Sequence, residues 1–173
     1  MPRGNWSSNT GATTTSNPMN QDFKDLLRLF AEHDVEYLVV GGYAVMHHAQ
    51  PRYTKDLDIR IHPDAGNAGR VAQALRKFGV PLTEVTPDDF AQEGLQFMIG
   101  VPPCAVDFLT TVEGLDFPVA WASRSTSMVD GIPVYYLSLR DLIESKKATS
   151  RPQDLADLDE LAKTIPQPEG GDE

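Results

Sequence analysis

The pattern that best indicates the fold runs from Tyr37 to Ile61, YLVVGGYAVMHHAQPRYTKDLDIRI. Its first four residues are apolar and rich in β-branched and aromatic side chains, which predicts a short buried strand ending at Gly41 and Gly42. Residues 43–49 contain no helix breaker and are soon followed by Pro51, so they predict a helix. The first half of the stretch therefore predicts a strand, a glycine turn and a helix in direct succession.

The second half of the stretch, residues 56–61, alternates charged with apolar side chains, which is the period of a β-strand. Asp56 and Asp58 should share one face of that strand, with Leu57 and Ile59 on the other. Two carboxylates side by side repel each other, and a stable domain gains nothing from this unless a cation lies between them. Mg²⁺ typically uses one or two carboxylates together with substrate phosphates. The pair therefore predicts a metal site.

The two glycines supply a complementary feature, and thirteen residues separate them from the Asp pair. A Gly-Gly turn at a helix N-terminus lets the backbone approach a ligand closely and offers free N–H groups to an anion. Gly41 and Gly42 alone would indicate only a tight turn, and Asp56 with Asp58 alone could be a solvent-facing edge strand. Their combination predicts a phosphate cradle beside a metal site, as phosphoryl or nucleotidyl transfer requires.

The pattern of Val40-Gly41-Gly42 followed by Asp56-Leu57-Asp58-Ile59 resembles the nucleotidyltransferases of the DNA polymerase β type. That family has a third carboxylate on a later strand between apolar residues, and Val106-Asp107-Phe108 is similar to this element. The resemblance implies that Asp107 is a third metal ligand or the base that activates the acceptor. From the residues alone, Asp107 could instead cap a strand end or pair with an arginine.

Two further segments look like a narrower group, the small bacterial nucleotidyltransferases that include abortive-infection toxins of the AbiEii type. These are the extended forms of the two motifs, from Gly41 to Ala44 and from Arg52 to Asp58, and the C-terminal segment 141–157. The resemblance covers residues 21–164. It implies that Lys146 lies near the nucleoside triphosphate, whereas the residues alone also allow a solvated helix face there.

The resemblance implies an α/β (α+β) fold, in which helices flank the mixed β-sheet of the minimal nucleotidyltransferase and a helical segment follows at the C-terminus. It also implies two Mg²⁺ ions, with Mn²⁺ as an alternative. The carboxylates that would serve catalysis and hold the metal are Asp56, Asp58 and Asp107. The residues expected to bind the nucleotide are Gly41, Gly42, Arg52, Thr54 and Lys146. For Arg52, neutralising the carboxylates is an equal alternative.

The expected reaction moves a nucleoside monophosphate from a nucleoside triphosphate to an acceptor hydroxyl. The acceptor could be an RNA end, a protein side chain or a small molecule, and the sequence leaves the three open. Two alternatives concern the role of the protein. It could be a catalytically silent nucleotide-binding or regulatory protein with the same fold, or a toxin whose further partner is an antitoxin protein.

Bulk properties exclude several classes of protein. The 173 residues carry a net charge of −10, which disfavours a broad nucleic-acid-binding surface. No apolar run approaches the ~18 residues of a membrane span, and the N-terminus has no secretory h-region. A single cysteine, Cys104, excludes an internal disulfide. These properties predict a cytoplasmic protein that does not bind a membrane.

The remaining chain predicts one domain. Residues 1–20 are polar without an apolar period and are expected to be disordered, residues 21–164 form the domain, and residues 165–173 are an acidic tail. Apolar residues at helical spacing predict a helix over 22–33. A helix is also predicted from Asp64 to Phe78, and an Asp-Gly hairpin around Asp130. Residues 95–101 and 104–109 are expected to be adjacent strands, followed by helices beginning at Ser138 and Pro152.

Overall fold

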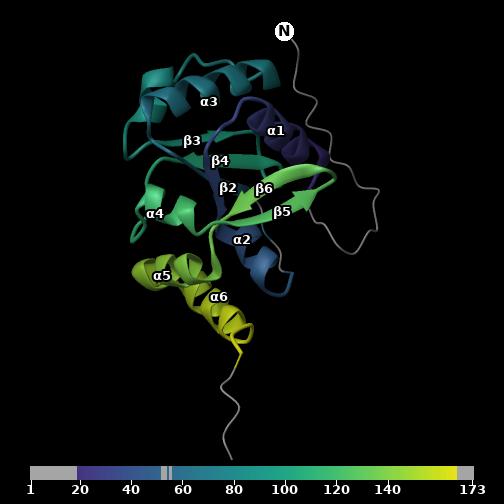
Figure 1. Ribbon diagram of the computed structural model, residues 1–173, viewed down its shortest axis with the longest axis vertical. Coiled ribbons are helices and arrows are strands. Elements are labelled where there is room, and N and C mark those ends of the chain that lie inside the picture. The colour runs from purple at the N-terminus through teal and green to yellow at the C-terminus, as the bar shows by residue number, and fades with distance from the viewer. Residues whose placement is uncertain (1–18, 52–53, 55, 167–173) are drawn as a thin grey trace, which may run out of the picture.

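A mixed six-stranded sheet with the strand order β3-β4-β2-β1-β6-β5 forms the centre of the protein (Figure 1). The structure is a computed structural model, which describes residues 19–51, 54 and 56–166. The strands are β1 (Tyr37–Val40), β2 (Asp56–Ile61), β3 (Gln96–Ile99), β4 (Ala105–Leu109), β5 (Ser125–Val129) and β6 (Ile132–Tyr136). The predicted mixed sheet is confirmed.

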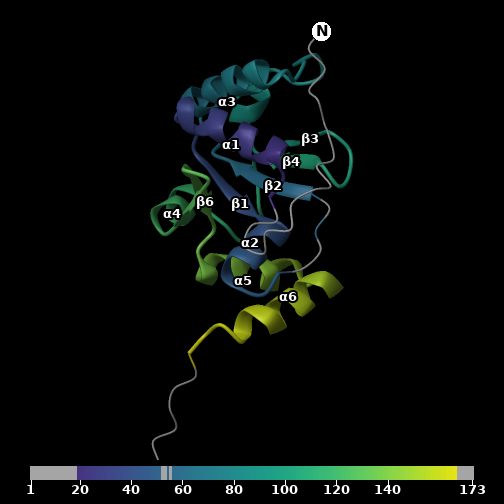
Figure 2. The same ribbon diagram turned by 90° about the vertical axis from the view of Figure 1, so that its right-hand side faces the viewer.

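Helices lie at both ends of this sheet. They are α1 (Gln21–Glu32), α2 (Gly41–His48), α3 (Ala65–Phe78), the 3₁₀ helix η1 (Pro87–Ala91), α4 (Phe117–Ala122), α5 (Leu139–Thr149) and α6 (Pro152–Ala162). Figures 1 and 2 show α1 and α3 together at one end of the molecule and α5 with α6 at the other. Helix α2 lies between the sheet and the α5–α6 pair, and it contacts both. The predicted C-terminal helical segment is thus packed onto the domain.

The register of the central strands places the sequence motifs next to each other. Strand β1 runs antiparallel to β2 and sets Val40 opposite Asp58, while β2 runs parallel to β4 and sets Asp58 opposite Asp107. Residues directly opposite each other in a sheet share a face. The turn that follows β1 and two carboxylates on neighbouring strands therefore meet at one place on one face.

Apolar side chains on the other face of β2 anchor this arrangement. Leu57, Ile59 and Ile61 are fully buried, as the alternation in the sequence predicts. They belong to one hydrophobic cluster, to which helix α1 contributes Phe23 and Phe30. Because a shift of the register by one residue would bury the aspartates and expose these apolar residues, the core fixes which way Asp58 faces.

Local signals set most of the element ends as predicted. Asp64 accepts a hydrogen bond from the backbone N–H of Asn67 at 3.1 Å, which caps α3, and Gly79 ends that helix with φ +102°. The β5–β6 turn has positive φ at Asp130 and Gly131. Helix α4 was not predicted, because it is only six residues long and its burial of Phe117 depends on tertiary packing.

The folded part begins earlier than residue 21. Met19 is buried, and the side chain of Asn20 caps α1 by accepting from the backbone N–H of Phe23 at 2.9 Å. Of the disordered segment predicted for residues 1–20 and the flexible tail predicted for 165–173, residues 1–18 and 167–173 lie outside the described residues. None of the helices in the described residues is long and apolar enough to cross a membrane.

Candidate functional site

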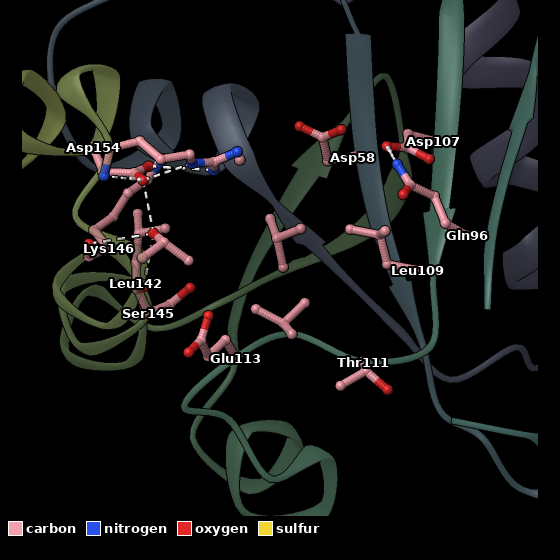
Figure 3. A pocket seen from close by; sticks show the side chains of 15 residues that line it. Asp58, Gln96, Asp107, Leu109, Thr111, Glu113, Leu142, Ser145, Lys146 and Asp154 are labelled. Carbon is pink, nitrogen blue, oxygen red and sulfur yellow. Dashed lines mark hydrogen bonds and ion pairs between the residues drawn. The ribbon is translucent and has the colours of Figure 1, made fainter. Parts of the chain in front are cut away.

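A pocket of about 500 Å³ opens where the two motifs meet (Figure 3). Its floor is the face of the sheet that carries Asp58 and Asp107, and its far wall is formed by α5 and the start of α6. Gly41 lines it at the start of α2, and the segment after β4 closes another side. The lining residues are Val40, Gly41, Asp58, Gln96, Asp107, Leu109, Thr111, Val112, Glu113, Leu142, Ser145, Lys146, Thr149, Arg151 and Asp154.

Gly41 is required by both its conformation and its surroundings. Its φ of +63° is unfavourable for residues with a side chain, and a Cβ atom at this position would overlap the carboxylate of Asp58. Gly42, the second predicted residue, is buried in the first turn of α2. The first glycine thus lets the helix N-terminus and the carboxylate lie next to each other, as an anion held beside a metal would need.

We expect Gly41→Ala to destabilise the protein by about 2 kcal/mol or more, because a left-handed conformation costs roughly 1–2 kcal/mol and the overlap with Asp58 adds to it. Urea unfolding monitored by circular dichroism measures the effect. Gly69→Ala is the matched control, since Gly69 lies inside α3 with no atom near its added Cβ. The control should be neutral or stabilising. Equal stability of the two variants would contradict the close approach.

Asp58 sits in an environment that opposes its negative charge. Burial, followed by the charges of Asp107 and Asp56, raises the pKa of Asp58 to about 7, although Lys146 and Arg151 partly oppose this rise. The negative charge of Asp58 is therefore unfavourable in the folded protein, and a bound cation would stabilise it. Such strongly shifted groups in a cleft are typical of functional sites.

The raised pKa of Asp58 predicts a pH dependence of stability. An unfolded Asp titrates near pH ~4, so the folded state binds the proton more tightly between that pH and about 7. The contribution of this carboxylate to the free energy of unfolding is then fully present at low pH and is lost as the pH rises through this window. In metal-free buffer, the difference in stability between Asp58→Asn and the wild type should grow across this window and then level off. A difference independent of pH, in parallel urea titrations, would contradict the shift.

Asp107 is held by a neighbour on the edge strand. The Gln96 side-chain amide donates to Asp107 Oδ2 at 2.9 Å, while Asp107 Oδ1 is buried and has no hydrogen-bond partner among the residues that the structure describes. The pKa of Asp107 is raised overall. Burial is the main cause and the charge of Asp56 adds to it, while the Gln96 hydrogen bond partly opposes the rise. No sequence motif marks Gln96, because its role follows only from the β3–β4 pairing.

Asp56 lies two residues before Asp58 on β2, but it does not line the pocket. Its Oδ1 atom is buried and has no hydrogen-bond partner within the described part of the chain. Thr54, predicted to bind nucleotide, is half-buried and donates its hydroxyl to the Asp56 carbonyl at 3.2 Å. In the structure this hydroxyl therefore supports the backbone of the Asp strand. Arg52 lies outside the described residues.

The chemistry of this carboxylate set fits a hard divalent cation. Asp56 and Asp107 each have a buried oxygen for which the described residues offer no hydrogen-bond partner, and the charges of both act on Asp58. Buried carboxylate oxygens are normally hydrogen-bonded or bound to a metal. Within residues 19–51, 54 and 56–166, no three His, Cys, Asp or Glu side chains already form a compact metal cluster. The metal roles of the three aspartates remain predictions.

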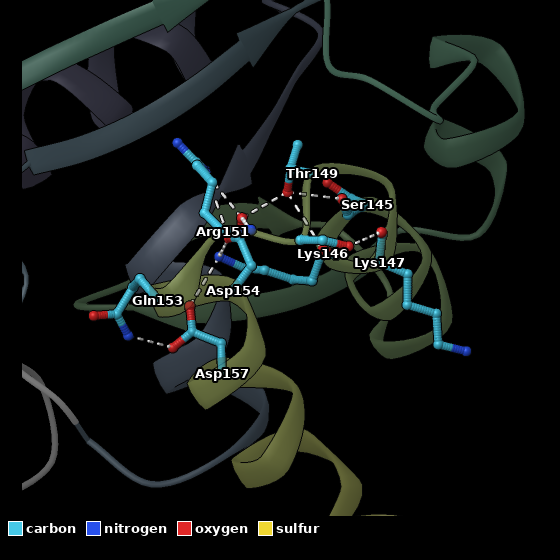
Figure 4. Close-up of polar contacts among 9 residues, drawn as sticks. Ser145, Lys146, Lys147, Thr149, Arg151, Gln153, Asp154 and Asp157 are labelled. Atoms are coloured by element: carbon cyan, nitrogen blue, oxygen red, sulfur yellow. Dashed lines mark hydrogen bonds and ion pairs between the residues drawn. The ribbon is translucent and has the colours of Figure 1, made fainter.

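Lys146 is buried rather than solvated. Only 7% of the residue is exposed, and its ammonium forms ion pairs with Asp154 at 3.1 Å and Asp157 at 2.9 Å (Figure 4). Both aspartate side chains are 1% exposed. The alternative of a solvated helix face is therefore wrong. Lys146 lines the pocket and neutralises two buried charges, and its role toward a nucleotide stays a prediction.

Asp154 connects this ion pair to the start of α6. Its carboxylate accepts from Lys146, from the Thr149 hydroxyl at 2.7 Å, and from the backbone and guanidinium of Arg151 at 3.1 and 2.8 Å. Burial alone would raise the pKa of Asp154, but the hydrogen bonds from Arg151, Thr149 and Lys146 outweigh it and hold the pKa well below its usual range. Arg151 lines the pocket and was not among the predicted site residues.

Comparison with known proteins supports a nucleotidyltransferase fold. Residues 19–165 match the family described as "Nucleotidyltransferase of unknown function (DUF6036)". No curated protein matches the chain. One solved structure with a similar fold is the lincosamide antibiotic adenylyltransferase LnuA with bound lincomycin. It has 17% sequence identity and a TM-score of 0.55, and the similarity covers 85% of this chain and 98% of LnuA.

A second solved structure is ANT(2")-Ia in complex with adenylyl-2"-tobramycin. It has 15% identity and a TM-score of 0.53, and the similarity covers 83% of this chain and 87% of the other. At these identities the likeness shows the fold, which confirms the predicted nucleotidyltransferase architecture. Neither structure nor the family description concerns a toxin, so the AbiEii-type grouping stays a prediction from the sequence.

Proposed function

Since the chain belongs to the DUF6036 family of nucleotidyltransferases, we propose that its pocket transfers a nucleoside monophosphate from a nucleoside triphosphate to a hydroxyl group of a small polar molecule. The observation that carries this proposal is the meeting of Gly41 with the Asp58 carboxylate, opposite Asp107, at one side of one pocket. An anion cradle and a set of under-neutralised carboxylates are what a metal-bound triphosphate requires.

Each part of the site has a distinct task in this proposal. Asp56, Asp58 and Asp107 would hold Mg²⁺, which when bound stabilises charge on the reacting oxygens. The backbone at Gly41 receives the phosphates, and Lys146 adds positive charge from the opposite wall. Asp107 would also accept the proton of the acceptor hydroxyl. Positioning and charge neutralisation then supply most of the rate.

The pocket favours a small acceptor over RNA. Its volume of about 500 Å³ falls within the range of roughly 300–1,000 Å³ that is typical of small-molecule sites. Among the described residues that line it, the cations are Lys146 and Arg151, both already paired with Asp154, whereas Glu113 adds a further negative charge. Two cations can serve the phosphates of one nucleotide but not the successive phosphates of a long strand. Both similar structures hold an antibiotic, which agrees with a hydroxylated small molecule as acceptor.

The proposal is tested by following a nucleotide that is radiolabelled at the α-phosphate. Each of the four triphosphates is incubated with the protein, Mg²⁺ and, in separate reactions, hydroxylated antibiotics, total RNA or cell protein. Thin-layer chromatography and gels then show what becomes labelled. We expect label in a small molecule. Label in RNA would overturn the proposed acceptor and favour a toxin-like role. No transfer under any condition would favour the catalytically silent alternative.

A further inference from the structure

The ion-pair network at the α5–α6 junction contains two cations with very different accessibility (Figure 4). Lys146 is buried, and two carboxylates already accept from its ammonium. The Arg151 side chain is 72% exposed, although it also forms an ion pair with Asp154. Both residues line the pocket. A ligand in the pocket could therefore approach the guanidinium without breaking the buried pairs, which it could not do at the ammonium.

Asp154 binds only one edge of the Arg151 guanidinium. Its Nε and Nη2 atoms donate to the two oxygens of Asp154 at 2.8 and 3.5 Å, and no described residue accepts from Nη1. An arginine has five N–H donors in a planar fork that matches the geometry of a phosphate. One edge of the fork is thus held by a carboxylate, and the other edge remains available to a ligand.

The position of Arg151 relative to the carboxylates fits the same ligand. Arg151 and Asp58 line the same pocket. A triphosphate whose α-phosphorus lies at Asp58 carries most of its negative charge on the two phosphates beyond it. An exposed guanidinium on the wall of the same pocket is suited to these terminal phosphates.

We propose that Arg151 binds the terminal phosphates of the nucleoside triphosphate, that Asp154 positions its guanidinium, and that Lys146 acts mainly as the buried counter-ion of Asp154 and Asp157. This assignment rests on the proposed function, because it needs a triphosphate in the pocket. It makes Arg151 a binding residue, whereas the resemblance implied a nucleotide-binding role in this segment only for Lys146. Asp154 is a positioning residue, since it reaches the nucleotide only through Arg151.

The test measures the affinities of Mg²⁺-bound nucleoside triphosphate and of the corresponding monophosphate by isothermal titration calorimetry. Arg151→Ala should weaken triphosphate binding about 10- to 100-fold, the range for a lost hydrogen bond between charged groups. Monophosphate affinity should stay within about twofold, because the terminal phosphates are missing. Arg151→Lys should be intermediate, since lysine keeps the charge but loses the fork. Lys147→Ala is the matched control, being an exposed neighbour that does not line the pocket.

Asp154→Asn tests the positioning role. If Asp154 acts through Arg151, adding Arg151→Ala to it should weaken triphosphate binding less than Arg151→Ala does in the wild type. Fully additive effects of the two substitutions would overturn that role. Should Asp154→Asn fail to fold, the arginine variants still decide the binding role.

Two results would overturn the assignment of Arg151 alone. Arg151→Ala could bind triphosphate as the control does, or it could lose affinity for the monophosphate and the triphosphate equally. Either result would leave the proposed function standing if the wild type still transfers the nucleotide. A wild-type protein that binds no triphosphate at all would instead overturn the proposed function and this assignment together.

Discussion

Asp58→Asn is expected to reduce nucleotidyl transfer by about a thousandfold or more. The metal held by this carboxylate would contribute several kcal/mol of charge stabilisation, and each ~1.4 kcal/mol is a factor of ten in rate. The variant should also lose the thermal stabilisation by Mg²⁺ and triphosphate. For the wild type, a hundredfold excess over Kd gives about 2.7 kcal/mol, which is roughly 5–10 °C in Tm for a domain of this size.

Without metal, Asp58→Asn should be at least as stable as the wild type. Since the pKa of Asp58 in the folded protein is about 7, its charge opposes folding in mildly alkaline buffer by up to about 4 kcal/mol. Asparagine removes that charge and keeps the shape. Asp88→Asn, at an exposed position in η1, is the control for the same change in net charge. A lower Tm for metal-free Asp58→Asn than for this control would show that Asp58 is a structural partner.

Lys146→Ala is expected to destabilise the fold by about 3–5 kcal/mol, the usual effect of removing one partner from a buried ion pair. Asp154 and Asp157 would each lose a positive partner in the interior. The expected fall in Tm is roughly 10 °C or more. Thermal and urea unfolding, in buffer without nucleotide, measure it directly.

Lys147→Ala again provides the control, because Lys147 is 61% exposed and pairs with Glu144 only at 3.7 Å. Its effect should be within about 0.5 kcal/mol. Adding Asp157→Asn to Lys146→Ala should recover part of the lost stability, since one uncompensated charge is then gone. Equal stability of Lys146→Ala and Lys147→Ala would mean that the buried pairs contribute nothing.

The fold and the centre of the site could be predicted because their signals are local. The alternation of residues 56–61 sets the buried and pocket faces of β2, and the glycine turn fixes where α2 begins. The apolar flanks of Asp107 mark it as part of a buried strand. Each of these features depends on residues that are close together in the sequence, so the pattern of side chains indicates it directly.

The remaining features depend on which segments meet in three dimensions. Gln96 contacts Asp107 because β3 pairs with β4, and nothing near Gln96 in the sequence marks that pairing. The burial of Lys146 could not be predicted from the sequence, because it results from the packing of α5 against α6. The exposure of Arg151 at the same junction follows from the same packing. Long-range contacts of this kind have no short-range signature.

The most direct test of nucleotidyl transfer uses one triphosphate labelled either at the α-phosphate or at the γ-phosphate. With Mg²⁺ and an acceptor, the α-label should appear in the acceptor and the γ-label only in released pyrophosphate. Both signals should disappear in Asp58→Asn and in the presence of a chelator. Transfer of the γ-label to the acceptor, or full transfer by Asp58→Asn, would contradict the account.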